Sequence, residues 1–569
     1  MYVALCDYGA VTIVDVMNNY FLEDAMSCEV SCANNHEKVA HANMMPMTVH
    51  EIAVAVRGTV SNNNSSSAVA DTGVAEIVVT SACSDSRQVR HGAVFVAIAG
   101  ERVDGHDYVQ RAEQAGAVTA IVEHVVEGVD FPQIVVSDSV EALGLLAKHN
   151  LERRRALEQP FTIIGITGSV GKTTTKDMLH ALLSTVGETV APVGSFNNNI
   201  GLPLTALQVG SKTRFLIAEM GANHVGEIAN LTRIAPPDLA VVLKVGVAHL
   251  GEFGSVERIA QAKSEIVRGL VPHGVAVLNA DDSRVAAMAH LVENKHVRWF
   301  GRNVNHKMLE SARQDEYQLL ASDVSLDSFG KAMFTLTERV SSDCVHATQV
   351  HLAIQGEHNV MNALAAANVA RSLGVTLSTI AAVLGEVSHI SPHRMQLSTV
   401  SHGDEQFTLI DDSFNANPDS MKAGIDGLCA YEHTADRQVH SLFRIAVLGS
   451  MLELGSNEDE LHTDIGEYAA QSTVDAVVAV GSQTDAELDR LAQCIARGAQ
   501  SSWQHKQLSA IHAVHWVHSA DEADACVWKL VAGHSSSVVL LKGSHASGLS
   551  VLAECWKKLS DDAHSHCSQ

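Results

Sequence analysis

The chain has 569 residues, of which 46% are hydrophobic, 18% charged and 4% aromatic. This length fits about three to four domains, and the apolar fraction is enough for sizeable cores, which excludes wholesale disorder. The formal charge of −26 excludes a general binder of nucleic acid or of anionic membrane surfaces. No run approaches the ~20 apolar residues of a membrane span, and the start lacks the basic residues of a secretory signal. We therefore expect a cytoplasmic monomer with no nucleic-acid partner and no membrane insertion.

The pattern along the chain predicts an α/β protein of three domains behind an extension. Residues 1–46 are expected to be poorly structured, since they lack a clear periodicity up to the methionine-rich stretch. Residues 47–160 alternate short apolar runs with helical stretches, which indicates a small α/β domain. Residues 161–385 contain four long apolar strands between helices, which indicates a parallel sheet covered on both faces. Residues 386–569 repeat the alternation and are expected to form a Rossmann-like domain.

Individual elements can be placed in the outer two domains. The first is expected to open with a helix over Thr48–Val60, followed by short strands at Ile77–Thr80, Val94–Ile98, Thr119–Val122 and Ile134–Val136. The last is expected to contain strands at Phe407–Ile410, Arg444–Leu448, Val474–Val480 and Ser537–Leu541. Strands that alternate with helices favour parallel pairing.

A glycine-rich turn opens the second domain, where an apolar strand runs into Gly168–Thr175 (GSVGKTTT) and then a helix. The glycines let backbone N–H groups curl around phosphate, Lys172 reaches the β- and γ-phosphates, and the Thr173 hydroxyl can bind Mg²⁺. Residue 166 is Ile where the strict P-loop pattern has Gly, so the match is to the shorter G-x-x-G-K-T core. The sequence predicts a nucleotide site here, and the alternative is a glycine-rich turn without a ligand.

Polar side chains stand where other strands of the predicted sheets end. Glu219 and His249 each follow an apolar run, and Asp411 and Asp412 follow another. In open α/β sheets, ligands bind at the carboxyl ends of the strands. A single carboxylate there is commonly a cap, but a carboxylate that follows a P-loop strand is where nucleotide enzymes hold a metal.

Lys263 is expected on the apolar face of a helix over Val256–Leu270. At ~100° per residue, this lysine shares its face with Ile259, Ala262 and Ile266. A buried lysine is costly unless it is paired or chemically altered. The alternative is a lysine at the helix edge that extends its ammonium to water.

Nine short motifs follow one another in order within about residues 47–555. They are Thr167–Thr173 (TGSVGKT), Asn197–Pro203 (NNNIGLP), Glu219–His224 (EMGANH), Ala248–Leu250 (AHL), Ala262–Ile266 (AKSEI), His358–Asn362 (HNVMN), His393–Arg394 (HR), Asp411–Asn417 (DDSFNAN) and Leu541–Ser544 (LKGS). This set resembles the Mur ligases of peptidoglycan synthesis. The stretch Ser84–His106 is similar to the UDP-sugar-binding domain of that family.

The resemblance implies a UDP-sugar-binding domain, a central P-loop ATPase-like domain and a Rossmann-like ligase domain. It also implies a reaction in which ATP activates the terminal carboxylate of UDP-N-acetylmuramoyl-tripeptide as an acyl phosphate. The amine of D-alanyl-D-alanine would then attack, so that an amide forms and phosphate leaves. Such chemistry needs charge neutralisation and alignment more than a protein nucleophile.

The resemblance further implies roles for individual residues. The catalytic residues would be Lys172, Glu219, His249 and Lys263. ATP contacts would come from Gly168, Ser169, Val170, Gly171, Lys172, Thr173, Thr174, Asn359, Asn362, Arg394 and Asp412. Two Mg²⁺ ions would be held by Thr173, Glu219, His249 and Lys263, and in related ligases the matching lysine is carbamylated. Substrate contacts would come from Ser86, Arg87, Asn197, Asn198, Asn415, Asn417 and Ser420, with a surface pairing role as the alternative for Arg87.

Two positions depart from the family pattern, and three rival functions stay open. Ser450 and His545 stand where the family usually has Asp and Arg. A Mur ligase that adds the third amino acid, or a folylpolyglutamate synthase, would share the P-loop. The former usually carries Asp-Asn-Pro-Arg where this chain has Asp411–Pro418 (DDSFNANP), which favours the dipeptide-adding enzyme. The rival from another class is a nucleotide-binding regulatory protein that has lost ligation.

Overall fold

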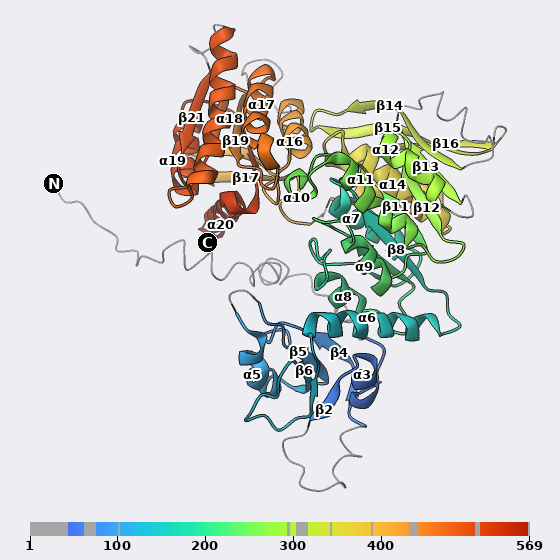
Figure 1. The fold of residues 1–569 in the computed structure, drawn as a ribbon. Helices are drawn as coiled ribbons and strands as arrows, with labels where there is room; N and C mark the ends of the chain where they lie inside the picture. The colour runs from blue at the N-terminus through green and yellow to red at the C-terminus, as the bar shows by residue number, and fades with distance from the viewer. Residues whose placement is uncertain are drawn as a thin grey trace.

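The computed structural model describes most of the chain (Figure 1). The described residues are 44–61, 76–100, 103–292, 296–302, 317–341, 344–388, 391–431, 442–506 and 512–566. Most of the expected N-terminal extension, residues 1–43, lies outside them. Within the described ranges, no helix is both long and apolar enough to cross a membrane. Several parallel sheets carry helices on their faces, which confirms the predicted α/β class.

The first domain is built on a five-stranded sheet with the order β2-β7-β6-β5-β4. Its strands are β2 (Thr59–Ser61), β4 (Ser81–Cys83), β5 (Ala93–Val96), β6 (Ala117–Val122) and β7 (Gln133–Val135). Strands β4 to β7 run parallel, and β2 pairs antiparallel with β7. A separate antiparallel pair joins β1 (Met47–Thr48) to β3 (Val78–Val79), and the helices are α3 (Val49–Ala55), α5 (Val109–Gln114) and α6 (Ser139–Arg155). The four predicted strands of this domain therefore correspond to β3, β5, β6 and β7.

The predicted helix over Thr48–Val60 is too long. Helix α3 ends at Ala55, and Arg57 takes a positive φ of 59° before the chain enters β2. Thr59 and Val60 then pair with β7. Both are β-branched, so a sheet edge suits them better than the last turn of a helix. The contact with β7 overrides the local helical pattern.

The predicted extension over residues 1–46 overlaps the packed part of the chain. Met44 and Met45 are buried in the same apolar cluster as the first domain, and the backbone N–H of Met45 donates to Asn150 Oδ1 at 2.9 Å. Among the described residues, packing therefore starts at Met44, three residues before the predicted boundary. The sequence pattern missed this contact because three residues are too few to show a periodicity.

The central domain contains a nine-stranded sheet with the order β16-β15-β14-β13-β12-β11-β8-β10-β9. The strands are β8 (Thr162–Thr167), β9 (Thr189–Val190), β10 (Phe215–Glu219), β11 (Leu239–Val242), β12 (Val275–Asn279), β13 (Val297–Gly301), β14 (Gln318–Leu326), β15 (Lys331–Ser341) and β16 (Cys344–Gln355). The seven strands from β9 to β14 in this order run parallel. The other two, β15 and β16, extend the sheet in antiparallel fashion, so the expectation of an all-parallel sheet is wrong at this edge.

Helices cover both faces of the parallel part, as predicted. The helices of this domain are α7 (Lys172–Ser184), α8 (Gly201–Ala206), α9 (Glu227–Ile234), α10 (Leu250–Phe253), α11 (Val256–Arg268), α12 (Ser283–Ala286), α14 (Asn359–Ser372) and α15 (Leu377–Glu386). Alternate residues of β8 enter different cores: Ile163 packs with α9 and α11, whereas Ile164 packs with α7 and α14. This alternation is what a strand buried on both faces requires.

The third domain has a six-stranded sheet with the order β17-β18-β22-β19-β20-β21. Its strands are β17 (Gln396–His402), β18 (Glu405–Asp411), β19 (Phe443–Gly449), β20 (Ala476–Val480), β21 (Ala513–Val517) and β22 (Ser537–Lys542), and its helices are α16 (Pro418–Ala430), α17 (Glu458–Gln471), α18 (Ala486–His505), α19 (Ala520–Val531) and α20 (Leu549–His566). Only β17 runs antiparallel to its neighbour. The four predicted strands are confirmed as β18, β19, β20 and β22.

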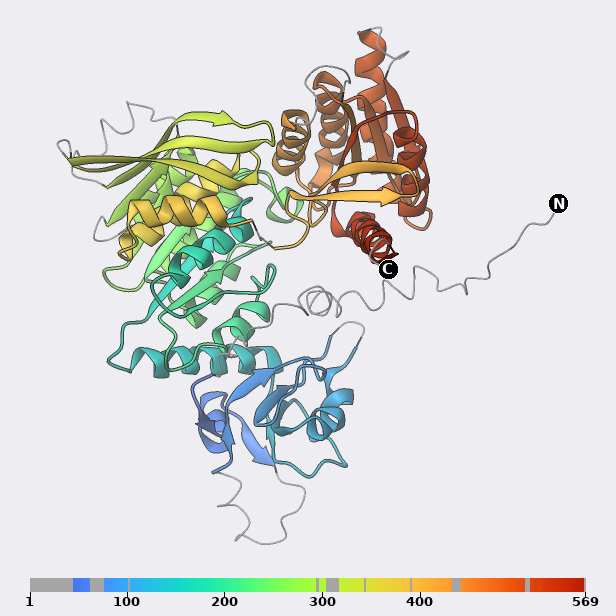
Figure 2. The ribbon, with the colours of Figure 1, turned by 180° about the vertical axis from the view of Figure 1, so that it is seen from behind.

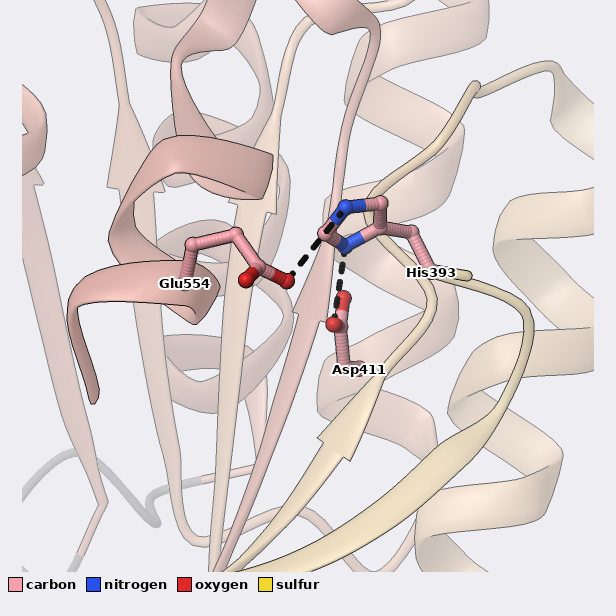
Figure 3. A group of neighbouring side chains, drawn as sticks. All are labelled: His393, Asp411 and Glu554. Atoms are coloured by element: carbon pink, nitrogen blue, oxygen red, sulfur yellow. Dashed lines mark hydrogen bonds and ion pairs between the residues drawn. The ribbon is translucent and has the colours of Figure 1, made fainter. Parts of the chain in front are cut away.

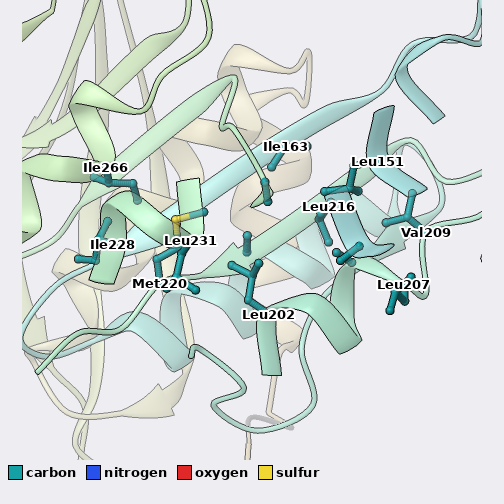
Figure 4. Close-up of a cluster of buried hydrophobic side chains, with 14 of the residues drawn as sticks. Leu151, Ile163, Leu202, Leu207, Val209, Leu216, Met220, Ile228, Leu231 and Ile266 are labelled. Carbon is teal, nitrogen blue, oxygen red and sulfur yellow. The ribbon is translucent and has the colours of Figure 1, made fainter. Parts of the chain in front are cut away.

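Helix α6 joins the first domain to the central domain. Both views place it along the border between them (Figures 1 and 2). Leu151 of α6 lies in one apolar cluster with Leu207 and Val209 of the central domain (Figure 4). The buried amide of Asn150 donates to the carbonyls of Ala206 and Val209 at 2.9 and 3.0 Å. The two domains therefore share one core across this helix.

The burial of Met44 and Met45 lets us predict how truncation affects stability. Removal of residues 1–43 should leave the melting temperature unchanged, whereas a start at Met47 should lower the free energy of unfolding by about 2 kcal/mol or more. The shorter chain loses two buried methionines and leaves Asn150 Oδ1 without the N–H of Met45. Calorimetric melting of the two truncations beside the full chain measures the difference. Equal melting temperatures for the starts at Met44 and Met47 would show that this packing is energetically irrelevant.

Candidate functional site

A cavity of about 440 Å³ opens where the carboxyl ends of β8, β10 and β11 face the third domain. Its lining includes, from the central domain, Gly168, Ser169, Val170, Gly171, Lys172, Thr173, Thr174, Asn197, Glu219, Lys244, His249, Lys263, Asn359 and Asn362, and, from the linker and third domain, Arg394, Asp412, Asn415, Asn417, Asp419, Ser420 and Lys542. Most of the predicted site residues thus meet in one place, although they come from distant parts of the sequence.

The glycine-rich turn between β8 and α7 forms one wall. Gly171 has a φ of 83°, and a Cβ there would lie 2.2 Å from Asn362 Oδ1, so no other residue fits without movement. Lys172 Nζ donates to the carbonyl of Gly168 at 2.9 Å, and burial lowers the pKa of this lysine. The start of the 13-residue helix α7 adds positive potential. This wall is suited to bind phosphate groups.

Glu219 lies beside this turn as a buried carboxylate, 1% exposed. Its Oε2 accepts a hydrogen bond from Thr173 Oγ1 at 3.1 Å, and its Oε1 accepts one from Asn197 Nδ2 at 3.0 Å. A carboxylate and a hydroxyl in contact form the hard oxygen set that Mg²⁺ prefers. The residues present therefore fit a magnesium ion next to the phosphate wall.

Lys263 extends into the same cavity from α11. It is 4% exposed, so the alternative of a helix-edge lysine that reaches water is wrong. Burial, with a smaller contribution from the charge of Lys172, lowers its pKa to about 7. Near neutral pH, a large fraction of such lysines carries an uncharged, nucleophilic amine.

His249 lines the cavity but has a partner that the sequence did not reveal. It has a φ of 58°, and its Nδ1 contacts the Oε2 of Glu453, which itself has a φ of 61° and belongs to the third domain. The N–H of Gly251 donates to the carbonyl of Glu453 at 2.8 Å. A non-glycine residue with positive φ is held by its surroundings at some cost, and here two such residues meet across a domain border.

The side of the cavity next to α14 carries amides. Asn359 Nδ2 donates to the carbonyl of Gln355, and Asn362 Nδ2 donates to Asn359 Oδ1 at 2.8 Å. Asn362 Oδ1 also accepts from Thr175 Oγ1 at 3.4 Å, which ties the start of α14 to α7. Both asparagines line the cavity, and their contact with the adenine side of ATP stays a prediction from the resemblance.

The third domain and the linker before it complete the cavity. Arg394 stacks on the ring of Phe414, with Cζ 4.2 Å from the centroid, and its Nη2 donates to Thr173 Oγ1 at 3.4 Å. Asp412 forms an ion pair with the buried Lys542, whose Nζ lies 2.7 Å from Oδ2. Burial lowers the pKa values of both Arg394 and Lys542.

Several predicted substrate residues have local structural contacts. Asn198 is not among the lining residues, and its Oδ1 accepts the N–H groups of Ile200 and Gly201 at the start of α8. Asn417 and Ser420 line the cavity but also form the capping box of α16. A matching motif alone cannot distinguish a helix cap from a ligand contact.

The predicted UDP-end residues lie in the first domain, away from this cavity. Ser86 is buried on the loop that follows β4. Arg87 forms an ion pair with Asp85 at 2.9 Å, as the surface alternative for this residue proposed. Neither residue lines the cavity.

Two charged groups of the site were missed. Lys244 follows β11 and pairs with Asp419 of the third domain, with Nζ 3.0 Å from Oδ1. The sequence offers a signal for this residue, a lysine at the carboxyl end of an apolar strand. Lys542 stands inside the LKGS motif at the end of β22, but the motif by itself gave it no role.

Comparison with known proteins follows the same domain divisions. The family descriptions "Mur ligase family, catalytic domain", "Mur ligase middle domain" and "Mur ligase, glutamate ligase domain" match residues 79–151, 166–370 and 393–545. The chain is 38% identical over 533 residues to UDP-N-acetylmuramoyl-tripeptide–D-alanyl-D-alanine ligase of Mycobacterium tuberculosis, which covers 90% of this chain and 98% of the relative. It is 34% identical over 412 residues to the enzyme of that name from Escherichia coli, covering 72% and 83% of the two chains.

Solved structures agree in fold. A crystal structure of MurF from Acinetobacter baumannii superposes with a TM-score of 0.72 at 29% identity and covers 90% of this chain and 99% of that one. MurF ligase from Thermotoga maritima, in complex with ADP, superposes with a TM-score of 0.64 at 27% identity and covers 85% and 98%. The architecture of three α/β domains is therefore the one found in these structures.

From the buried amine of Lys263 we predict how the free energy of unfolding depends on pH. Its pKa is about 7 in the folded protein, against about 10.5 for an exposed lysine, so between these values the unfolded chain binds a proton that the folded chain does not. Stability should therefore rise with pH across this window. In buffer freed of carbon dioxide, Lys263→Met should raise the free energy of unfolding near pH 7 by several kcal/mol, on the order of 1.4 kcal/mol per pKa unit.

The gain from Lys263→Met should shrink as the pH rises toward 10. Urea titrations at about pH 7, 8 and 9 measure it. Lys148→Met on the surface of α6 is the matched control, because Lys148 is exposed and should give no pH-dependent gap. A gain from Lys263→Met that is constant with pH would contradict a buried, uncharged amine.

Proposed function

The chain belongs to the Mur ligase family, and we propose that it joins D-alanyl-D-alanine to UDP-N-acetylmuramoyl-tripeptide in an ATP-dependent reaction of peptidoglycan precursor synthesis. The observation that carries the proposal is the meeting of Lys172, Glu219, Lys263 and Arg394 in one cavity at the border of the central and third domains. The substrate names come from relatives that match this chain over nearly their whole length. We place the reaction in the cytoplasm.

The proposed reaction has two steps. The terminal carboxylate of the tripeptide attacks the γ-phosphorus of ATP, so that an acyl phosphate forms and ADP leaves. The amine of D-alanyl-D-alanine then attacks the acyl carbon, phosphate leaves, and the nitrogen loses a proton. Negative charge concentrates on phosphoryl oxygens in both steps, and Lys172 and Arg394 are positioned to stabilise it. The carbonyl of Gly168, which holds Lys172 Nζ in this structure, would release it to the β- and γ-phosphates.

The metal ions have candidate ligands among the chain's own residues. Thr173 and Glu219 would hold one Mg²⁺, and His249 with Lys263 would serve a second. Such ions supply charge neutralisation and alignment for phosphoryl transfer. Asn197, which the resemblance assigns to substrate, would also orient the Glu219 carboxylate through its hydrogen bond at 3.0 Å.

Lys263 would act as a carbamate. Its depressed pKa supplies the uncharged amine that reacts with carbon dioxide, whereas an ammonium at this place would repel Mg²⁺. Carbamylation replaces a buried cation by a hard oxygen ligand, which removes the energetic conflict of a lysine among Ile259, Ala262 and Ile266.

The residues that would bind the UDP group and the dipeptide are assigned from the resemblance to the family. Ser86 and Arg87 are the candidates for the UDP end. For the dipeptide end, the candidates are Asn415, Asn417 and Ser420. All three also have local contacts: Asn415 Oδ1 accepts the N–H of Ala416 at 2.8 Å, and Asn417 and Ser420 form the capping box of α16. Ser450 and His545 replace the usual charged residues there, so this end of the site differs most from the family pattern.

Phosphate release tests the function. Full-length protein with ATP and Mg²⁺ should release phosphate only when both UDP-N-acetylmuramoyl-tripeptide and D-alanyl-D-alanine are present, and mass spectrometry should show the joined product. A panel with lysine or diaminopimelate as the third residue defines the tripeptide, and free amino acids in place of the dipeptide are the control. Release with a free amino acid and UDP-dipeptide would favour the tripeptide-forming rival. ATP binding without any release would favour a regulatory protein.

Replacement of Lys263 tests the carbamate. Lys263→Ala should lower turnover ~10²-fold or more while the fold persists, because the lost oxygens act on charge that develops during reaction. Added bicarbonate or a short carboxylic acid should restore part of the turnover. Lys263→Arg should not be rescued, since its guanidinium fills the space and cannot form the carbamate. Near-normal turnover of Lys263→Ala would remove both the carbamate and the second metal ion from the proposal.

A further inference from the structure

The linker between the central and third domains reaches the cavity through Arg394. Inside the cavity this side chain is held weakly: its hydrogen bond to Thr173 Oγ1 is 3.4 Å long, and its buried Nε has no hydrogen-bond partner. The ring of Phe414 supports one face of the guanidinium. Besides these contacts and the nearby charges of Asp412, Glu219 and Asp177, the position of Arg394 depends on the backbone that carries it.

The residue before Arg394 belongs to a cluster on the other side of the linker. His393 Nδ1 lies 2.9 Å from Asp411 Oδ2, and its Nε2 lies 3.7 Å from Glu554 Oε1 on helix α20 (Figure 3). Lys557, one turn along the same helix, places its Nζ 3.0 Å from both Asp411 Oδ2 and Glu554 Oε1. We call His393, Asp411, Glu554 and Lys557 the linker anchor.

In two pairs of adjacent residues, His393–Arg394 and Asp411–Asp412, the first residue belongs to the linker anchor and the second lines the cavity. His393 and Asp411 contact α20, whereas the next residue in each case, Arg394 or Asp412, lines the cavity. The N–H of Phe414 donates to the carbonyl of His393 at 3.3 Å and links the two segments. The linker anchor therefore holds the residue directly before each of the two cavity residues, Arg394 and Asp412.

The backbone beside Arg394 is unusual in a way that needs such support. His393 has a φ of 59° and Met395 a φ of 51°, so two non-glycine residues with left-handed backbone flank the arginine. Each conformation costs free energy and persists only where the surrounding contacts impose it. The anchor supplies those contacts for His393.

The central domain holds the other end of the linker. The N–H of Ser391 donates to Asp177 Oδ2 at 2.9 Å, and Lys176 Nζ lies 3.3 Å from Ser391 Oγ. Both residues belong to α7, the helix that starts at the phosphate-binding turn. Arg394 thus lies between an attachment to α7 and an attachment to α20.

The anchor could be read instead as a metal site, because ligand atoms of His393, Asp411 and Glu554 lie within 4.8 Å of one another. The ammonium of Lys557 already occupies the position of a cation against both carboxylates. Although burial opposes it, the contact with His393 and the charge of Lys557 hold the pKa of Asp411 at about 2, and the two carboxylates raise the pKa of Lys557. The charges of the cluster are thus balanced by the chain itself.

We propose that Glu554 and Lys557 of helix α20 are positioning residues for the nucleotide, since through His393 and Asp411 they hold Arg394 and Asp412 against the cavity. The inference rests on the proposed function, because it assigns ATP to that cavity. It gives helix α20, none of whose described side chains lines the cavity, a part in nucleotide binding.

Lys557→Met tests the inference in the full-length enzyme. The KM for ATP should rise about tenfold, and kcat should fall as well, because Arg394 also acts on the charge that develops during phosphoryl transfer. The KM for UDP-N-acetylmuramoyl-tripeptide should stay within about twofold, because Lys557 acts on the nucleotide side of the cavity. Lys557→Arg should keep the KM for ATP near the wild-type value. The matched control is Lys558→Met, which changes the same residue type one position along the helix, where the side chain is exposed.

Direct binding separates this inference from the proposed function. Isothermal titration of ATP should give a Kd that rises with Lys557→Met by the same factor as KM, and this holds even if ligation needs substrates other than those proposed. Glu554→Gln keeps the shape of the side chain and should also weaken ATP binding. It provides a second test in case Lys557→Met does not fold. Equal Kd values for Lys557→Met and Lys558→Met would overturn the inference. So would a transition metal that copurifies in equimolar amount with the wild type and is lost in His393→Ala.

Discussion

The site depends on one electrostatic constraint, the burial of basic side chains beside the Glu219 carboxylate. Lys172, Lys263 and Arg394 all line the cavity, and burial lowers the pKa of each one. Glu219 faces them as a carboxylate that is itself bound by Thr173 and Asn197. A chain with a formal charge of −26 therefore concentrates basic groups at one point, where Lys172 and Arg394 are the cations available to a triphosphate. The glycine turn, the amides of α14 and the linker all arrange groups around that point.

The parts of the site that come from single segments of the chain were predictable from sequence, because short motifs contain the residues that carry their chemistry. The P-loop core, the position of Glu219 after a buried strand and the apolar face around Lys263 each need only a strand or helix period to be recognised. The structure brings these residues into one cavity, as the alternating strands and helices implied. The α/β class followed from the same alternation.

The long-range pairings were not predictable in this way. Nothing near His249 indicates Glu453 as its partner, and nothing near Lys244 indicates Asp419, since each pair joins segments from different domains. The antiparallel edge formed by β15 and β16 was also missed, because a strand pattern does not reveal the direction of its neighbour. The motif match that implied a substrate contact for Asn198 also did not reveal that its side chain bonds to N–H groups at the start of α8.

The two domain borders differ in kind, and this has a consequence for how the protein could be recombined. The first and central domains share an apolar core across α6, with Asn150 bonded to carbonyls beyond it. The third domain keeps its own cores, and its described contacts with the central domain include polar pairs such as Lys244 with Asp419. A chimera that exchanged only the first domain with that of a relative would separate side chains that pack against one another in this shared core. Among the described residues, the apolar clusters of the third domain contain no residue of the first two domains, so the first two domains form one unit for recombination and the third a separate one.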